Sequence, residues 1–219
     1  QSTITFDYCI STMPIKDLFN AFSFSIPSDI KYISDNLVYR DFITVGILLD
    51  KTKIELNDNW IYIQESYVKV GRIQVFNNWS PFLVKESHTI WLGLEYFCNE
   101  SDTLWQLNEE ELIALATQEL IQLGFINASE NVLDATVIKV PKTYPAYFGA
   151  YNEFYKIREF VDPIDNLFLV GRNGMHKYNN QDHSMLTAMQ AVQNIKNGVL
   201  SKENIWSINT EEEYHEEKK

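Results

Sequence analysis

The stretch Leu169-Val-Gly-Arg-Asn-Gly-Met-His-Lys-Tyr-Asn-Asn-Gln-Asp-His-Ser184 is the part of this 219-residue chain that decides its fold. The apolar run Asn166 to Val170 predicts a short buried strand, and Asp182 to Asn197 predicts a closing helix. A helix N-terminus offers unpaired N–H groups and a partial positive charge, which suits an electron-rich ligand. Gly171 and Gly174 between the two elements would let the backbone approach that ligand.

This strand–turn–helix also has an ordinary interpretation, in which the glycines only make a turn, and the residues alone favour neither. The density of polar side chains from Arg172 to Ser184 is unusual for a plain connection. Asp182 or Ser184 is expected to be the N-cap of the helix. Its apolar stripe is expected to pack into the core, and consists of Met185, Ala188, Met189, Val192 and Ile195.

Composition places the chain among globular proteins, with 45% hydrophobic and 22% charged residues. The 13 Phe, 12 Tyr and 5 Trp suit a thick core or a pocket with aromatic walls. The formal net charge of −12 would repel nucleic acid and anionic membranes, so neither is an expected partner.

The cysteines and histidines predict no metal site. Cys9 and Cys98 lie far apart in apolar, strand-like contexts, so each is expected to be a buried free thiol. The four histidines lack the spacing of metal ligands. No apolar run has the length of a membrane span, and the N-terminus lacks a signal-peptide pattern. The expected compartment is therefore the cytoplasm.

The middle of the chain predicts an antiparallel sheet, because strands follow one another without intervening helices. Shorter helices are expected before them, at Ile15 to Phe22 and after Pro27, and a further helix after them, at Ala150 to Phe160. The predicted strands are Ile4–Ser11, Asp41–Asp50, Trp60–Gln64, Arg72–Phe76, Thr89–Phe97 and Val132–Val140. The fold class is therefore α+β, with a mostly antiparallel sheet and packed helices.

The clearest predicted helix runs from Asn108 to Leu123. Asn108 and Glu111 have the spacing of a capping box, and Gly124 supplies the C-terminal stop. Its buried stripe is expected to be Leu112, Leu115, Ala116, Leu120 and Leu123.

Particular motifs carry a family resemblance: Gly171-Arg172, Tyr178, Asn180-Gln-Asp-His-Ser184 and Ala191-Val-Gln-Asn-Ile195. They resemble the C-terminal flavin-binding segment of the FAD-dependent oxidoreductases related to amine oxidase, protoporphyrinogen oxidase and UDP-galactopyranose mutase. The residues of these motifs are most similar to those of the mutases. The resemblance implies that the Gly-Arg pair lies beneath the isoalloxazine ring and that the helix start meets the ribityl chain. The implied cofactor-binding residues are Gly171, Arg172, Asn180, Gln181, Asp182 and Ser184, with Tyr178 facing substrate.

Two further motifs imply substrate contacts. Asn59-Trp-Ile-Tyr-Ile63 followed by Gly71-Arg-Ile-Gln-Val-Phe-Asn-Asn-Trp-Ser-Pro81 is similar to a mutase pattern whose arginine meets the substrate diphosphate, which implies Arg72 here. The alternative is a strand arginine paired with an acidic neighbour. Lys142-Thr-Tyr-Pro-Ala-Tyr147 resembles the step before the last flavin strand, which implies Tyr144 near substrate.

A fourth motif, Asp7-Tyr-Cys-Ile-Ser-Thr-Met-Pro14, resembles the strand that re-enters the FAD domain. The chain contains no G-x-G-x-x-G fingerprint, so the resemblance implies a C-terminal portion in which FAD binds only together with the missing N-terminal half. The expected regions are a returning strand at 1–14, a substrate-binding domain at 15–145, an FAD-binding segment of an incomplete Rossmann-like domain at 146–200, and an acidic tail at 201–219.

Three functions follow as hypotheses. The first is an FAD-dependent oxidoreductase, in which the flavin carries the chemistry. The second is a mutase-like flavoenzyme acting on a nucleotide sugar, and the third is a non-catalytic module that binds a ligand or partner. A small-molecule substrate is the expected partner, and self-association is expected through the face left by the missing half.

Overall fold

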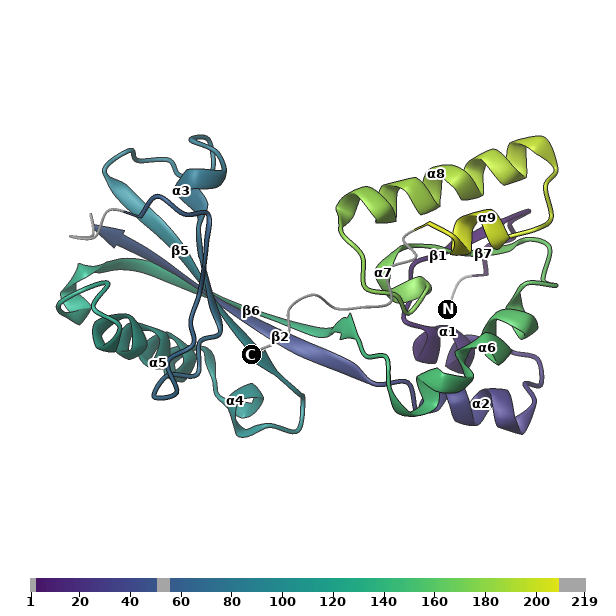
Figure 1. The fold of residues 1–219 in the computed structure, drawn as a ribbon, viewed down its shortest axis with the longest axis horizontal. Helices are drawn as coiled ribbons and strands as arrows, with labels where there is room; N and C mark the ends of the chain where they lie inside the picture. Colours follow the sequence, from purple (N-terminus) through teal and green to yellow (C-terminus); the bar gives the residue numbers. More distant parts are fainter. Residues whose placement is uncertain (1–2, 51–55, 209–219) are drawn as a thin grey trace. The chain divides into compact units, whose positions relative to one another are not determined.

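A computed structural model describes residues 3–50 and 56–208. The chain divides into two compact units, the first formed by residues up to Tyr39 and from Lys142 onward, and the second by Arg40–Pro141. Figure 1 shows the helices and strands of each unit.

The second unit is built on a five-stranded antiparallel sheet, in the order β3-β4-β5-β2-β6. Its longest antiparallel pair is β2 (Tyr39–Asp50) with β5 (Thr89–Cys98), from Asp41 opposite Cys98 to Asp50 opposite Thr89. The short strands β3 (Trp60–Tyr62) and β4 (Arg72–Val75) extend one side. The predicted antiparallel sheet is confirmed.

One face of this sheet is covered by α5 (Glu109–Gln122). Alternate residues of β2, from Ile43 to Leu49, are fully buried and pack in one core with Leu112, Ala116 and Leu120 of the helix. Asn108 and Glu111 form the predicted capping box. The helix is therefore confirmed, and of its predicted stripe Leu115 and Leu123 are only partly buried.

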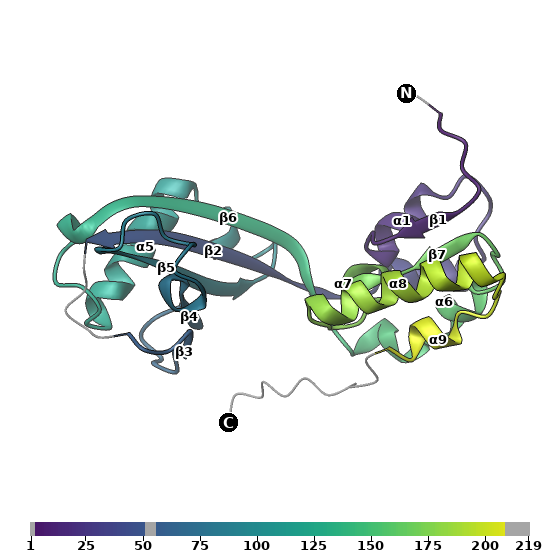
Figure 2. The same cartoon turned by 90° about the horizontal axis from the view of Figure 1, so that it is seen from above.

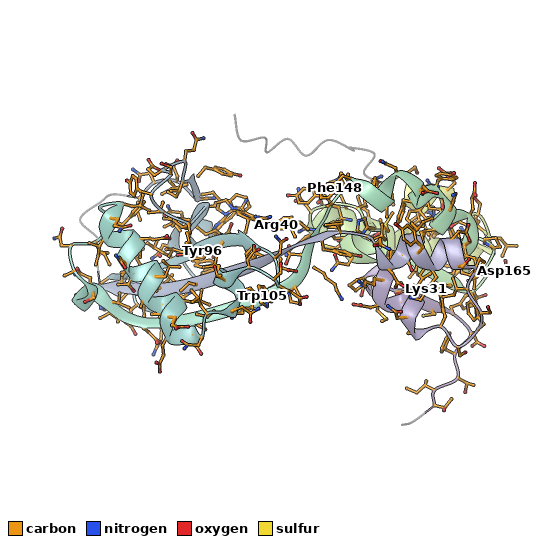
Figure 3. The ribbon with its side chains drawn as sticks, turned by 90° about the horizontal axis from the view of Figure 1, so that it is seen from below. Lys31, Arg40, Tyr96, Trp105, Phe148 and Asp165 are labelled. Atoms are coloured by element: carbon orange, nitrogen blue, oxygen red, sulfur yellow. The ribbon has the colours of Figure 1, made fainter. Side chains whose placement is uncertain are left out.

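A buried carboxylate ties α5 to the sheet. The hydroxyl of Tyr96, labelled in Figure 3, donates to Oε2 of Glu119 at 3.0 Å. The backbone N–H groups of Lys69 and Val70 donate to the same carboxylate at 2.6 and 3.1 Å. Burial and the neighbouring negative charge of Glu119 hold the pKa of Tyr96 far above its ordinary value.

Some boundaries in this unit differ from the sequence prediction. The short helix α3 (Phe76–Trp79) begins at the last residue of the predicted strand Arg72–Phe76, and neither it nor α4 (Thr103–Gln106) nor the 3₁₀ turn η1 (Ser129–Asn131) was predicted. Strand β6 (Val132–Pro145) continues through Pro141, where the sequence placed its end. An edge strand tolerates proline because one side of its backbone needs no ladder partner.

The first unit is a small sheet between helices. Strands β1 (Cys9–Ser11) and β7 (Leu167–Leu169) pair in parallel. Figures 1 and 2 show α8 on one side of these strands and α6 on the other. The helices are α1 (Ile15–Ala21), α2 (Ser28–Asp35), the 3₁₀ turn η2 (Gly149–Glu153), α6 (Phe154–Val161), α7 (Gly171–Gly174), α8 (Gln181–Asn197) and α9 (Glu203–Trp206).

Residues 15–39 pack with the C-terminal region. Ile15, Phe19 and Ile33 share a core with Phe154 and Phe168. The compact units therefore divide at 39/40 and 141/142, whereas the expected functional regions divided at 14/15 and 145/146. The assignment of those regions to cofactor and substrate stays a prediction.

The region expected to be an acidic tail begins with folded structure. Ile205 and Trp206 of α9 are buried, and the Lys202 ammonium donates to the backbone oxygens of Val161, Asp162 and Ile164 at 3.3, 3.0 and 2.6 Å. Within residues 201–208, these contacts hold the chain against the end of α6. Residues 209–219 of the expected tail lie outside the described residues.

The apolar stripe of α8 meets the core only in part: Ala188 and Ile195 pack against it, as predicted, whereas the other three members are exposed. Met185, Met189 and Val192 are 64%, 64% and 54% exposed. The buried residues of α8 are Thr187, Ala191 and Asn194, on another face of the helix. A methionine–valine stripe predicted the helix correctly but did not predict which face meets the core.

Candidate functional site

The site indicated by the sequence is the connection between β7 and α8, where α7 forms a single helical turn. Gly171 has φ +73°, a conformation that favours glycine, and its N–H donates to Thr187 Oγ1 at 3.1 Å. A side chain added at Gly171 would first meet Ser184 Oγ, at 3.7 Å. The fold therefore brings the predicted residues Gly171 and Ser184 together.

Gly174 has a different role from the predicted one. A Cβ at Gly174 would lie 2.5 Å from the carbonyl oxygen of Ser11, which no side chain could tolerate. The close approach at this position is therefore to the backbone of β1, and it fixes α7 against that strand.

Arg172 lies beside a pair of stacked tyrosines. Its Nε and one terminal nitrogen donate to the Asn179 carbonyl at 3.0 and 2.6 Å, and the other terminal nitrogen donates to the Thr143 carbonyl at 3.4 Å. The Tyr144 and Tyr178 rings stack with centroids 5.9 Å apart, and the guanidinium lies 5.3 and 4.7 Å from them. Three predicted site residues thus form one cluster.

The start of α8 presents polar groups to solvent. Its N-cap is Asn180, whose N–H lies 3.4 Å from Nδ1 of His183, so the expectation of Asp182 or Ser184 as the cap was wrong. Gln181 and Asp182 are exposed in the first turn. Ser184 instead points inward and donates to Asn179 Oδ1 at 2.9 Å.

His176 lies at the centre of the same loop and is fully buried. Its Nε2 is 3.2 Å from the Ala146 carbonyl, and the rings of Tyr39, Tyr151 and Phe154 surround the imidazole at centroid distances of 4.6, 5.7 and 5.9 Å. Burial lowers the pKa of His176 from its ordinary 6.5 to about 4, against the opposing effect of the Ala146 hydrogen bond. The imidazole is therefore neutral at physiological pH.

Arg72 belongs to the second unit and is 5% exposed. Its Nε forms an ion pair with Glu95 Oε2, and the Gln74 amide donates to the other oxygen of Glu95. The guanidinium lies 3.9 Å from the centre of the Trp60 ring. This is the arrangement expected of a strand arginine with an acidic neighbour, and the predicted contact with a diphosphate stays a prediction.

Some residues of the loop escaped the sequence prediction. The amide and carbonyl of Asn179 bind Ser184 and Arg172, Thr187 receives the Gly171 N–H, and the Tyr147 hydroxyl accepts from the Tyr178 N–H. Asn179 stood in the polar run, but nothing in its spacing separated it from its neighbours. Thr187 and Tyr147 gave no signal, because their roles depend on which backbone groups the fold brings near them.

Three other features of the described residues bear on function: groups that could hold a metal ion, the reactivity of the cysteines, and any helix that could span a membrane. No group of three or more His, Cys, Asp or Glu side chains within residues 3–50 and 56–208 is arranged to hold a metal ion. Cys98 is a buried free thiol as predicted, whereas Cys9 is only partly buried. Burial and the charge of Asp41 raise the Cys98 pKa to about 11, so it is a poor nucleophile. Within those ranges, no helix combines the length and apolar character needed to cross a membrane.

Comparison with solved structures assigns the architecture. A crystal structure of reduced UDP-galactopyranose mutase superposes with a TM-score of 0.79 and 21% identity over 94% of this chain and 44% of that one. The fold is similar to that of UDP-galactopyranose mutase. No protein-family model and no curated protein sequence matches the chain.

Two further structures share the fold more distantly. A protein provisionally described as a protoporphyrinogen oxidase, from an Exiguobacterium species, has a TM-score of 0.60 and 14% identity, over 85% of this chain and 41% of that one. The PF1083 protein of Pyrococcus furiosus has a TM-score of 0.52 and 12% identity, over 94% and 43%. The chain spans less than half the length of each of these proteins.

Proposed function

We propose that this chain is the C-terminal part of an FAD-dependent oxidoreductase of the amine oxidase-like superfamily, and that the loop from Gly171 to Ser184 holds the flavin. The observation that carries the proposal is the turn between β7 and α8. Gly171 has a left-handed backbone, its N–H is fixed by Thr187, and the first turn of a 17-residue helix is exposed beside it. The similarity in fold to the mutase and to the protein described as an oxidase supports it.

The residues of this loop fit a flavin chemically. Gln181 and Asp182 are exposed at the positive end of α8, where amide and carboxylate groups can bind the hydroxyls of a ribityl chain. Gly171, Arg172, Asn180 and Ser184 would shape the surface beneath the ring, and Tyr144 and Tyr178 would face substrate. FAD supplies the electron transfer, while these side chains position the ring and exclude water.

The proposed cofactor site needs a second half. A two-stranded parallel sheet is rarely stable alone, since parallel strands are usually buried within larger sheets. Along the segment before and within β1, apolar side chains alternate and are exposed, namely Ile4, Phe6, Tyr8 and Ile10. We propose that another part of the same flavoprotein covers this segment and the exposed stripe of α8. Without it, the 219-residue chain should be colourless and prone to self-association.

A mutase-like activity on a nucleotide sugar is the second candidate, favoured by the mutase fold. It assigns Arg72 to the substrate diphosphate. Because Arg72 is buried against Glu95 and Trp60, a diphosphate would have to reach the guanidinium while the Glu95 pair holds its Nε side. Nucleotide binding should therefore be weak unless the neighbouring aromatic side chains move.

The test uses the longer gene product, including the segment upstream of Gln1, produced in the cytoplasm, which is its expected compartment. A flavin spectrum at near-equal stoichiometry supports the FAD proposal. If the reduced protein also binds UDP-galactose, and Arg72→Lys weakens that binding about tenfold or more while Arg40→Ala does not, the mutase candidate is favoured. A yellow protein indifferent to UDP-sugars favours an oxidoreductase. A colourless longer protein leaves only a non-catalytic binding module.

A further inference from the structure

We propose that His176 is a positioning residue for the proposed flavin loop: its neutral imidazole fastens the loop from Gly171 to Asn180 onto the segment Thr143–Tyr147. The inference rests on the proposed function for its consequence, but its geometry is independent of any cofactor. It assigns a role to a buried histidine that none of the contacts proposed for flavin or substrate uses.

The backbone at His176 is unusual. Its φ is +46°, and among the described residues only Lys142 is another non-glycine residue with positive φ. Such a conformation costs free energy for a residue with a Cβ, so surrounding contacts must hold it in place. His176 N–H donates to the Asn173 carbonyl at 3.3 Å, which continues the α7 turn into this conformation.

The imidazole joins two segments that are 30 residues apart in sequence. Its Nε2 lies 3.2 Å from the Ala146 carbonyl, and because a carbonyl only accepts, Nε2 carries the proton. Next to this contact, the Tyr178 N–H donates to the Tyr147 hydroxyl, and Arg172 donates to the Thr143 carbonyl. The His176 contact is therefore the middle one of three that hold the loop to Thr143–Tyr147.

The other ring nitrogen explains why histidine acts here only in its neutral form. Nδ1 is buried and has no hydrogen-bond partner among the described residues. Tyr39, Tyr151 and Phe154 pack against the ring from the start of β2, from η2 and from the start of α6, respectively. A proton on Nδ1 would place an uncompensated charge among aromatic rings, so the surroundings select the tautomer that bonds Ala146.

A consequence for the proposed cofactor site follows from the order of these residues. His176 stands between Arg172 and Tyr178, which stack on each other, and four residues before the N-cap of α8. Releasing the imidazole would free the segment that sets the Arg172 guanidinium and the start of α8. His176 therefore acts on the site through Ala146 and the backbone, without touching a ligand.

The experiment measures backbone hydrogen exchange in the 219-residue chain, in which Lys177 and Tyr178 donate to the Arg172 carbonyl and the Tyr147 hydroxyl. His176→Phe keeps an aromatic ring and removes the donor. We expect exchange at these two amides to accelerate at least tenfold, with Ala191 of α8 and Leu94 of β5 unchanged. His88→Phe, at an exposed histidine of the second unit, is the control and should leave all four amides as they are.

Two results would overturn the proposal. Equal exchange at Lys177 and Tyr178 in folded His176→Phe would mean that packing alone holds the loop, and uniform acceleration that includes Ala191 would mean a general structural role. If the variant does not fold, the ¹⁵N signals of the wild-type imidazole decide: we expect Nε2 protonated and Nδ1 bare at pH 7, and the opposite tautomer contradicts the proposal. None of these measurements depends on flavin, so their failure is distinct from failure of the FAD proposal.

Discussion

Helices α5 and α8 were predicted from the same kind of apolar stripe, yet the structure buries the stripe of α5 and leaves much of the stripe of α8 exposed. In α5, Leu112, Ala116 and Leu120 are fully buried against the five-stranded sheet. In α8, Met185, Met189 and Val192 are more than half exposed. An apolar period of 3.6 residues identifies a helix and its apolar side, but whether that side is covered depends on which elements are present to pack against it.

The largest expected effect on the free energy of unfolding is in the buried stripe of α5. Leu112→Ala should destabilise the protein by about 3 kcal/mol, because a fully buried side chain leaves a cavity that its neighbours fill only in part. Urea unfolding followed by circular dichroism gives the difference in free energy of unfolding. A loss below about 1 kcal/mol would mean that α5 is not the core helix described here.

The next prediction tests whether the core of the first unit excludes water as well as the core around α5 does. Its probe is His176, whose folded-state pKa of about 4 lies below the ordinary 6.5. The unfolded state therefore binds the proton first as the pH falls. Stability should be full above pH 6.5 and should decline as the pH falls through 4, by an amount on the order of 3 kcal/mol.

The matched comparison for this pH dependence is His176→Phe. Carboxylates titrate in the same range, so the difference between wild type and variant isolates the histidine. Between pH 7.5 and 4 the unfolding free energy of the wild type should fall relative to that of the variant, because only the wild type has a histidine that the unfolded state protonates first. Parallel curves would show that water or a charge reaches His176.

A smaller effect is expected at the glycines that follow both helices. Gly124 and Gly198 follow α5 and α8 with φ of +79° and +66°, and neither has an atom within 4 Å of the position a Cβ would take. Replacing either by Ala should therefore cost only the backbone strain, about 1 kcal/mol. Equal losses in urea unfolding would confirm that the helix ends are alike although the stripes differ. A loss near zero at Gly198 would mean that the end of α8 is frayed.

The smallest expected effect is at the exposed stripe. Met189→Ala should change the free energy of unfolding of the 219-residue chain by less than about 0.5 kcal/mol, since the side chain already meets solvent. Met189→Glu should reduce concentration-dependent association, measured by analytical ultracentrifugation, while Tyr32→Glu, at an exposed residue of α2, should not. Unchanged association would mean that the chain does not associate through the exposed stripe of α8.

The sequence predicted those elements whose signals are local. The capping box of Asn108 and Glu111, the stop at Gly124 and the strand predicted at Asp41–Asp50 all depend on near neighbours, and the structure confirms them. The motif that predicted the loop between β7 and α8 was likewise contiguous. Sequence patterns thus predicted β7 and α8 to within a residue at each end, while the roles of the residues between them stay predictions.

What the sequence could not predict depends on contacts between distant segments. Nothing in the spacing of Gly174 showed that its neighbour would be the Ser11 carbonyl, or that Thr187 would receive the Gly171 N–H. Arg72 had two open interpretations, and only the register of β4 against β5 placed Glu95 opposite it. The burial of Ile205 and Trp206 escaped notice because an acidic, polar segment surrounds them.

The central claim, that the loop and α8 form half of a flavin site completed by another segment, is tested most directly by oxidation of the four methionines. Met175 is buried, whereas Met185 and Met189 are exposed on α8, so peroxide should oxidise those two quickly and Met175 slowly in the 219-residue chain. In the longer, flavin-loaded protein, mass spectrometry should find Met185 and Met189 protected at least tenfold. Equal reactivity of both methionines with flavin bound would contradict the account.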